Sequence, residues 1–193
     1  GNRRRRDHLV NDIWPLFHPI PLDVRLRFTD MGLHCHGGKG RRMPTHSETR
    51  TLPYTAQQMY DLVADVGSYP QFLPWCAAAR IRSRVAHGDS EVMDADLVIS
   101  FKVFRERFGS RVTLFPERKS IDTEYIDGPF RYMKSTWDFA DVGGGCEVKF
   151  FVDFEFKNAV LQGIIGVVFN EAMQRIVRAF ERRAAALYGP ATA

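Results

Sequence analysis

Residues 146–189 read CEVKFFVDFEFKNAVLQGIIGVVFNEAMQRIVRAFERRAAALYG, and within them the period of the apolar residues changes. Up to Phe156 apolar and polar residues alternate, which predicts a strand with one buried face. Asn158 is a suitable helix cap, and apolar residues then recur at helical spacing as far as Leu187, before Gly189. The segment therefore predicts a long strand followed by a helix of about 30 residues, which at about 1.5 Å per residue is about 45 Å long.

Upstream of this strand, the two-residue alternation recurs in several segments that short turns separate. They are residues 81–85, 93–101, 108–114, 121–125 and 133–139, and a further edge strand is expected at 46–52. Consecutive strands joined by short turns form an antiparallel meander with one dry face. A short helix is expected after Thr55, and a second short turn at 68–73. The sequence therefore predicts an α+β fold in which a curved antiparallel sheet wraps around the C-terminal helix.

The charge of the chain is divided unevenly along its length. Of the 27 Lys and Arg residues, nine lie within residues 1–42 against four Asp, so this leader carries +5 and the rest of the chain −1. The leader has no sustained apolar period and cannot bury enough surface to order itself. We expect residues 1–43 to be a disordered extension with Met43 as the physiological start, residues 44–189 to be the folded domain, and residues 190–193 to be a tail.

The composition excludes several classes of protein. The 193 residues are 45% hydrophobic and 12% aromatic, enough for one domain with a real core. No run of about 18 apolar residues predicts a membrane span. Three cysteines are too few for a disulfide framework, which favours a reducing compartment. The basic excess behind the pI of about 9.1 lies in the leader, so we expect no DNA partner.

The alternation also predicts which side chains face the interior of the sheet. None of the inner-facing residues between 81 and 156 is Asp, Glu, His, Lys, Arg or Cys. General acid–base catalysis needs a titratable group close to the substrate, so we expect no catalytic residue and no metal site. The sequence instead favours an oily hollow that no ionisable side chain enters, suited to an apolar ligand with a small polar end. A core simply filled by its aromatic rings is the alternative.

A more specific signal lies after the first short helix. Residues 65–76, DVGSYPQFLPWC, closely resemble the Asp-Val-x-x-Tyr-Pro-x-Phe-Leu-Pro-Trp-Cys signature of the coenzyme Q-binding START-domain family. That family belongs to the polyketide cyclase/START-like superfamily and includes the bacterial RatA ribosome association toxin. Residues 95–112, 128–139 and 180–189 resemble three further family segments. The resemblance covers residues 44–189, about three quarters of the chain.

The resemblance implies a helix-grip fold and a lipid chaperone, not an enzyme, that binds ubiquinone or a related polyprenyl quinone in support of respiratory electron transport. Ubiquinone is then a bound ligand, and no cofactor is expected. Three residues are placed at the cavity mouth, on a loop that either touches the bilayer or packs as a lid on its own core: Phe72, Leu73 and Trp75. Eight are placed along the interior: Leu97, Phe101, Trp137, Phe139, Phe150, Phe154, Ile165 and Phe169. Three are candidate donors to a quinone carbonyl: Ser110, Tyr125 and Ser135.

Two other functions remain open at this stage. A RatA-like toxin would bind the large ribosomal subunit and block subunit association, and a basic strip on the outer sheet face offers a contact for RNA phosphates. The strip consists of Arg80, Arg82, Arg84, Arg105, Arg107 and Arg111. Its ordinary interpretation is a solvated face balanced by nearby acids. A cyclase-like enzyme is the third alternative. We expect a protein of the bacterial cytoplasm with peripheral contact at the inner membrane, or of the mitochondrial inner membrane in a eukaryote.

Overall fold

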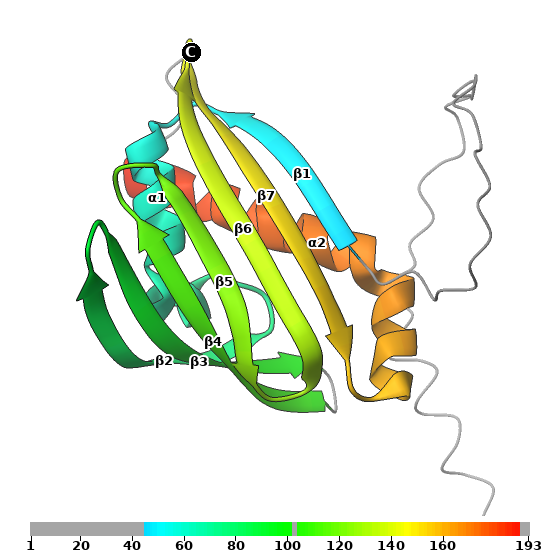
Figure 1. Ribbon diagram of the computed structural model, residues 1–193. Coiled ribbons are helices and arrows are strands. Elements are labelled where there is room, and N and C mark those ends of the chain that lie inside the picture. The colour runs from blue at the N-terminus through cyan, green and yellow to red at the C-terminus, as the bar shows by residue number, and fades with distance from the viewer. Residues whose placement is uncertain (1–44, 102–103, 190–193) are drawn as a thin grey trace, which may run out of the picture. The chain divides into compact units, whose positions relative to one another are not determined.

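The computed structural model describes residues 45–101 and 104–189. The expectations for residues 1–43, for Met43 as a start and for the tail at 190–193 lie outside these residues. The described part forms one antiparallel sheet and two α-helices, and α2 crosses one face of the sheet (Figure 1). The predicted α+β fold, with a curved antiparallel sheet around a long C-terminal helix, is confirmed.

The sheet has seven strands in the order β1-β7-β6-β5-β4-β3-β2. Apart from β1, which joins the far edge beside β7, each strand pairs with its neighbour in sequence, so the meander predicted from the short turns is confirmed. The strands are β1 (Thr45–Leu52), β2 (Cys76–His87), β3 (Ser90–Phe101), β4 (Phe104–Phe115), β5 (Ser120–Asp127), β6 (Phe130–Val142) and β7 (Gly145–Phe156).

Each α-helix begins at a side-chain cap. The helix α1 (Ala56–Ala64) starts at Thr55, whose hydroxyl accepts a hydrogen bond from the Gln58 backbone while the Gln58 side chain accepts one from the Thr55 backbone. The helix α2 (Ala159–Tyr188) starts at Asn158 and ends before Gly189. A 3₁₀-helix, η2 (Val66–Gln71), follows α1. The short helix expected after Thr55 and the long C-terminal helix are therefore both present.

The core between sheet and helices falls into two parts. The larger cluster joins α1 and the C-terminal part of α2 to the middle of the sheet, with Met59, Met93 and Ile121 almost fully buried. The smaller cluster joins Phe169 of α2 to Phe150, Val152 and Phe154 of β7. The helix thus anchors to the sheet at two places along its length. Within the described residues, no helix combines the length and the apolar composition needed to cross a bilayer.

The edge strand β2 differs from its prediction. Ile81, Ser83 and Val85 are expected to face a dry interior, but Ile81 and Val85 are 37% and 60% exposed and Ser83 is also exposed. A register shift between Ile81 and Ser83 interrupts the alternation. Beyond its partner β3, the element that packs against β2 is the short η2. Beyond the register shift the two faces are exchanged: Ser83 and Val85 pair with Asp94 and Val92 on the outer face, and Arg84 pairs with the buried Met93 on the inner face. The expected inner position of Ser83 and Val85 and the expected outer position of Arg84 are therefore wrong.

Candidate ligand-binding site

A cavity of about 190 Å³ lies between the inner face of the sheet, η2 and the C-terminal part of α2. We call it the main cavity. Its walls come from α1 and η2 on one side, from strands β3 to β7 on the floor, and from α2 above. The lining residues are Val63, Val66, Tyr69, Leu73, Leu97, Phe108, Ser110, Val112, Ile121, Thr123, Met133, Ser135, Trp137, Phe150, Val152, Ile176 and Phe180.

Three hydroxyl groups give the apolar floor of this cavity its polarity. Thr123 of β5 and Ser135 of β6 are direct cross-strand partners, so their side chains lie about 5 Å apart on the same face. Ser110 of β4 is two residues from Val112, the partner of Thr123. Ser110 is 2% exposed, and its hydroxyl donates a long hydrogen bond of 3.5 Å to the carbonyl oxygen of Ala95. The hydroxyls therefore form a row across three strands that can serve the polar end of a ligand.

Tyr69 is the one acid–base side chain on the wall of the main cavity. Its hydroxyl donates a 2.6 Å hydrogen bond to the carbonyl oxygen of Val63, and its ring packs edge-on against Phe72 and Phe180. Burial, with the charge of Asp65, raises the pKa of this phenol. Tyr69 is thus held neutral and fixed to the backbone, which makes it a wall residue and a poor general base.

Six of the fourteen residues expected to contact a ligand line the main cavity. They are Leu73, Leu97, Ser110, Ser135, Trp137 and Phe150. The other eight are not among the residues that line this cavity, and their contact with a ligand also stays a prediction. They are Phe72, Trp75, Phe101, Tyr125, Phe139, Phe154, Ile165 and Phe169. Whether the six wall residues bind a ligand stays a prediction.

At the expected mouth, the two aromatic side chains pack against other rings. Trp75 has a φ of 65°, a left-handed conformation that is rare for a bulky residue, and its ring packs edge-on against Phe101 at 5.5 Å. Phe72 packs against Phe180 at 5.3 Å and contacts Tyr69. The loop therefore folds onto its own core as a lid, and Leu73 is its contribution to the cavity wall.

The other displaced residues fill the two ends of the sheet. Phe139 is 4% exposed and packs edge-on against Tyr60 of α1. Phe154 and Phe169 belong to the smaller core cluster, where α2 packs on β7, and Ile165 packs against that cluster. Alternation places a residue on the inner face but does not say how far the helix stands from the sheet there.

Tyr125 also lies beyond the main cavity. The Tyr125 ring packs edge-on against Phe130. The Lys157 ammonium group lies 5.9 Å from the centre of the Tyr125 ring. The Tyr125 hydroxyl is buried without a hydrogen-bond partner among the described residues. Tyr125 is the cross-strand partner of Ser110 but is not among the residues that line the main cavity, so its role as a donor stays a prediction.

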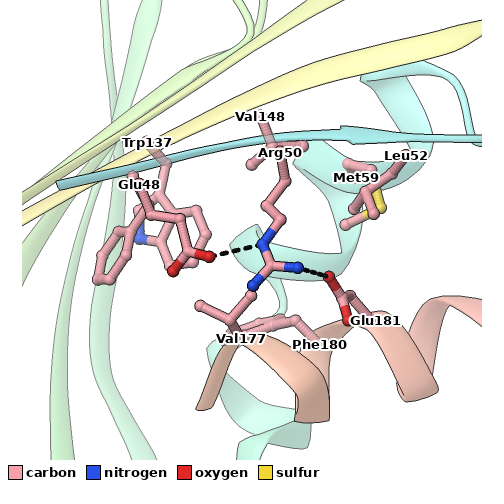
Figure 2. A pocket seen from close by; sticks show the side chains of 10 residues that line it. Glu48, Arg50, Leu52, Met59, Trp137, Val148, Val177, Phe180 and Glu181 are labelled. Atoms are coloured by element: carbon pink, nitrogen blue, oxygen red, sulfur yellow. Dashed lines mark hydrogen bonds and ion pairs between the residues drawn. The ribbon is translucent and has the colours of Figure 1, made fainter. Parts of the chain in front are cut away.

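A second, smaller pocket contradicts the expectation that no ionisable side chain enters the interior. Of about 30 Å³, it lies between β1 and α2 and contains Glu48, Arg50 and Glu181 (Figure 2). We call it the polar pocket. Its other lining residues are apolar: Leu52, Met59, Trp137, Val148, Phe150, Val177 and Phe180. The expectation fails because it was drawn from residues 81–156 and left out the edge strand β1, which turns Glu48 and Arg50 inward.

The charged groups of the polar pocket are closely paired. The Arg50 Nε donates to Glu48 Oε1 at 2.5 Å, and Arg50 Nη1 lies 3.4 Å from Glu181 Oε1. The other Glu48 oxygen lies 2.9 Å from His46 Nε2. Burial raises the pKa of Glu48, but the hydrogen bonds from His46 and Arg50 outweigh it and hold that pKa below its usual range. Glu48 is therefore a stable carboxylate, bound to its partners instead of poised to take a proton.

The described residues do not form a metal site of three or more ligands, and their two thiols are buried. Within residues 45–101 and 104–189, no three His, Cys, Asp or Glu side chains lie close enough to hold a metal ion. Cys76 and Cys146 are buried free thiols, and burial raises the pKa of both. The arrangement can enclose an apolar group and offer it hydroxyls, and it has a separate charged pocket at its side.

Residues 52–181 match the family described as polyketide cyclase / dehydrase and lipid transport. The chain belongs to this family. A solution structure of an 18 kDa protein from Caulobacter crescentus, a START-like relative, superposes with a TM-score of 0.66 at 34% identity, covering 77% of this chain and all of that one. The resemblance found in residues 65–76 and in the three later segments is thereby confirmed at the level of the START-like fold.

The names of two relatives indicate two different functions. The ribosome association toxin RatA of Rickettsia prowazekii is 43% identical over 145 residues, which cover 74% of this chain and 97% of the relative. The mitochondrial coenzyme Q-binding protein COQ10 homolog B of Xenopus laevis is 33% identical over 155 residues, 78% of this chain and 62% of the relative. The family therefore contains both functions considered from the sequence.

The basic strip on the outer sheet face is largely neutralised. Arg107 pairs with Asp96 at 2.6 Å and with Asp127 at 2.9 Å, and Arg111 pairs with Asp94 at 2.9 Å. Arg82 of β2 also has a carboxylate partner on β3, Asp96. The ordinary interpretation of the strip, a solvated strand face balanced by acids, is supported by these three of its six arginines. Such pairs weaken the attraction of a phosphate backbone. Arg84 pairs with Glu91, but its cross-strand partner is the buried Met93, so this pair lies on the inner side of the sheet.

Sequence reasoning missed three groups of site residues for different reasons. Thr123, Phe108, Val112, Met133 and Val152 were all expected on the inner face, so a fuller use of the alternation would have found them. The η2 residues Val66 and Tyr69 carried no such signal, because a 3₁₀ turn has no long period. In residues 46–50 both faces of the strand are polar, so nothing in the pattern says that His46, Glu48 and Arg50 point inward.

Proposed function

We propose that the main cavity binds the ring of a polyprenyl quinone, and that the protein carries this lipid without altering it. The observation that supports the proposal is the row formed by Ser110, Thr123 and Ser135 in an otherwise apolar cavity. An apolar enclosure with a few convergent polar groups is the usual form of a small-molecule site. The COQ10 homolog among the relatives favours a quinone over other amphiphiles.

The volume limits how much of the lipid is enclosed. A cavity of about 190 Å³ is smaller than the roughly 300–1,000 Å³ of sites that surround a drug-sized molecule. It can hold a substituted ring and the beginning of an isoprenoid tail, while the rest of the tail remains outside. The tail already lies in an apolar phase in the bilayer, so its transfer contributes little net free energy. Binding is then reversible and selective for the ring, which suits a carrier.

Purified protein tests this proposal directly. Lipids that leave the cell with the protein are extracted and identified by mass spectrometry, and ligand-free protein is incubated with liposomes that contain ubiquinone. We expect a quinone in the first sample and quinone uptake in the second. Protein that carries no quinone and takes none from liposomes would contradict the proposal.

Ribosome association is the second candidate function. It is favoured by the RatA relative, which is matched over 97% of its length. The neutralised outer sheet face argues against recognition of RNA by that strip alone, so this function would need another surface of the chain. Salt-sensitive co-sedimentation with the large ribosomal subunit would support it, and unchanged subunit association on overexpression would exclude it. For both functions we propose a cytoplasmic protein, with transient contact at the membrane for the quinone carrier.

A further inference from the structure

The polar pocket and the main cavity are separated by aromatic rings alone at one place. Trp137, Phe150 and Phe180 line both hollows, and Trp137 stacks on Phe150 with their ring centres 4.0 Å apart. Figure 2 shows the carboxylates of Glu48 and Glu181 on either side of the Arg50 guanidinium group. The polar pocket, at about 30 Å³, has room for about one water molecule or a ligand atom of similar size. A shift of one ring would join the two spaces.

The polar pocket has more unused hydrogen-bond acceptors than unused donors. Arg50 directs Nε at Glu48, Nη2 at Gln174 Oε1 at 3.1 Å, and Nη1 at Glu181, so each nitrogen of the guanidinium group has a partner. Glu181 has Arg50 as its only ion-pair or hydrogen-bond partner among the described residues, at 3.4 Å. An ionised carboxylate accepts several hydrogen bonds and donates none. The pocket can therefore accept further hydrogen bonds at Glu181 but has few donors left to offer.

The net charge of the polar pocket also favours a ligand group that donates a hydrogen bond. Two carboxylates and one guanidinium group leave one negative charge when His46 is neutral. An anionic head, such as that of a fatty acid, would be repelled and would find no unpaired cation. A neutral group that donates a hydrogen bond would instead be bound favourably, because it gives the Glu181 carboxylate a further partner.

We propose that the polar pocket receives a hydroxyl group of the bound ligand and so makes the site selective for the reduced form of the quinone. This inference rests on the proposed function. With the ring in the main cavity, a hydroxyl of the hydroquinone donates to Glu181, whereas the carbonyl of the oxidised quinone can only accept and would face a carboxylate. Sites built to pair a hydroxyl reject the analogue that lacks it, because a polar group that the ligand covers is then left unpaired. The Glu181 side chain is 30% exposed in the free protein, so this penalty arises where the bound ring shields it from water.

The experiment compares two forms of one soluble probe. Decylubiquinone and its hydroquinone are titrated under anaerobic conditions, with binding measured by isothermal calorimetry and by quenching of tryptophan fluorescence. We expect the hydroquinone to bind about tenfold more tightly. For a two-electron couple, that ratio raises the midpoint potential of the bound quinone by about 30 mV, which spectroelectrochemistry can measure independently. Decanoate is a third ligand and should bind more weakly than either form.

Variants at two glutamates of the same helix locate the effect. Glu181→Gln supplies an amide that donates as well as accepts, so the preference for the hydroquinone should fall to less than about twofold. Glu171→Gln is the matched control, since Glu171 is exposed and pairs only with Arg175 on the helix surface. It should keep the full preference.

The outcomes separate this inference from the proposed function. Wild-type protein that binds both forms with equal affinity would overturn the redox selectivity and leave quinone binding intact, and this comparison needs no variant. A preference that survives in Glu181→Gln would overturn the role of the polar pocket. Protein that binds neither form would overturn the proposed function as well.

Discussion

The thiol of Cys146 illustrates how burial of a single residue suppresses chemistry. Its side chain is fully buried, and burial together with the charge of Asp141 raises its pKa to about 11. The thiolate is the reactive form of cysteine, so at about pH 8 only a very small fraction of Cys146 can react. Cys76 is also buried, and its pKa is raised for the same reason.

We therefore predict that neither Cys76 nor Cys146 reacts with a disulfide reagent in the native protein. The measurement uses a Cys35→Ser variant and follows thiol labelling at about pH 8. No labelling is expected over the time in which a small-molecule thiol is consumed, and two thiols per chain should appear after unfolding in urea. A fast native phase would show that one of the two sites is open to solvent.

A second residue-scale prediction concerns Glu48 and acid stability. Its pKa in the folded protein is lower than in the unfolded chain, so its contribution is present above the unfolded pKa of about 4.3 and is lost as the pH falls through the folded value. Glu48→Gln should lower the free energy of unfolding by about 1–3 kcal/mol at neutral pH, because it breaks a charge-assisted hydrogen bond inside the fold.

Urea denaturation at a series of pH values checks this. The difference between wild type and Glu48→Gln should shrink as the pH falls from the unfolded pKa of about 4.3 through the lower folded pKa, because the wild-type carboxyl becomes protonated over that range. Glu171→Gln, which alters an exposed pair, should differ little from wild type at every pH. A constant difference across the acid range would mean that the charge of Glu48 is not what stabilises the fold.

At the scale of elements, the N-terminus of α2 depends on one capping side chain. The Asn158 Oδ1 accepts hydrogen bonds from the backbone N–H groups of Val160 at 2.8 Å and of Leu161 at 3.3 Å. We predict that Asn158→Ala lowers the free energy of unfolding by about 1 kcal/mol. Asn170→Ala is the control: Asn170 is exposed within the same helix, where alanine has the higher helix propensity, so that variant should be neutral or slightly stabilising. Equal losses in the two variants would contradict a capping role.

The elements also show what the pattern of the sequence can and cannot predict. The strand and the helix within residues 146–189 are found at the expected places, because both have a clear apolar period and the helix has an asparagine at its start. The strand β1 was expected, but its polar residues alternate with polar residues, so the direction of Glu48 and Arg50 depends on packing against α2. In β2 a register shift and an uncovered edge defeat the alternation.

For the candidate site, the alternation predicted which hydroxyl groups line the cavity better than it predicted which aromatic side chains do. The hydroxyl groups of Ser110 and Ser135 lie on the cavity wall as expected, whereas Phe139 and Phe154 lie on the right face of the sheet but outside the cavity. The distance between helix and sheet decides this, and it depends on the bulk of the side chains in between at each end. A single sequence specifies the face of a strand residue but not that distance.

At the scale of the described domain, the main question is whether the space between sheet and helix is available to a ligand. Ser135→Leu distinguishes a cavity from a packed core. In a close-packed core the added carbons would cost about 1–3 kcal/mol through strain. In a cavity of about 190 Å³ they bury apolar surface, worth about 0.8 kcal/mol per methylene group, and remove a hydroxyl that has no partner among the described residues.

We therefore predict that Ser135→Leu leaves the free energy of unfolding unchanged or raises it by up to about 2 kcal/mol, while quinone uptake from liposomes falls at least about tenfold. Thr136→Leu is the matched control, because Thr136 follows Ser135 on the same strand and points to the outer face; it should leave uptake unchanged. A stable Ser135→Leu protein that still takes up quinone would place the lipid elsewhere. A strongly destabilised one would mean that the space is already filled, and that the ribosome, not a lipid, is the partner to pursue.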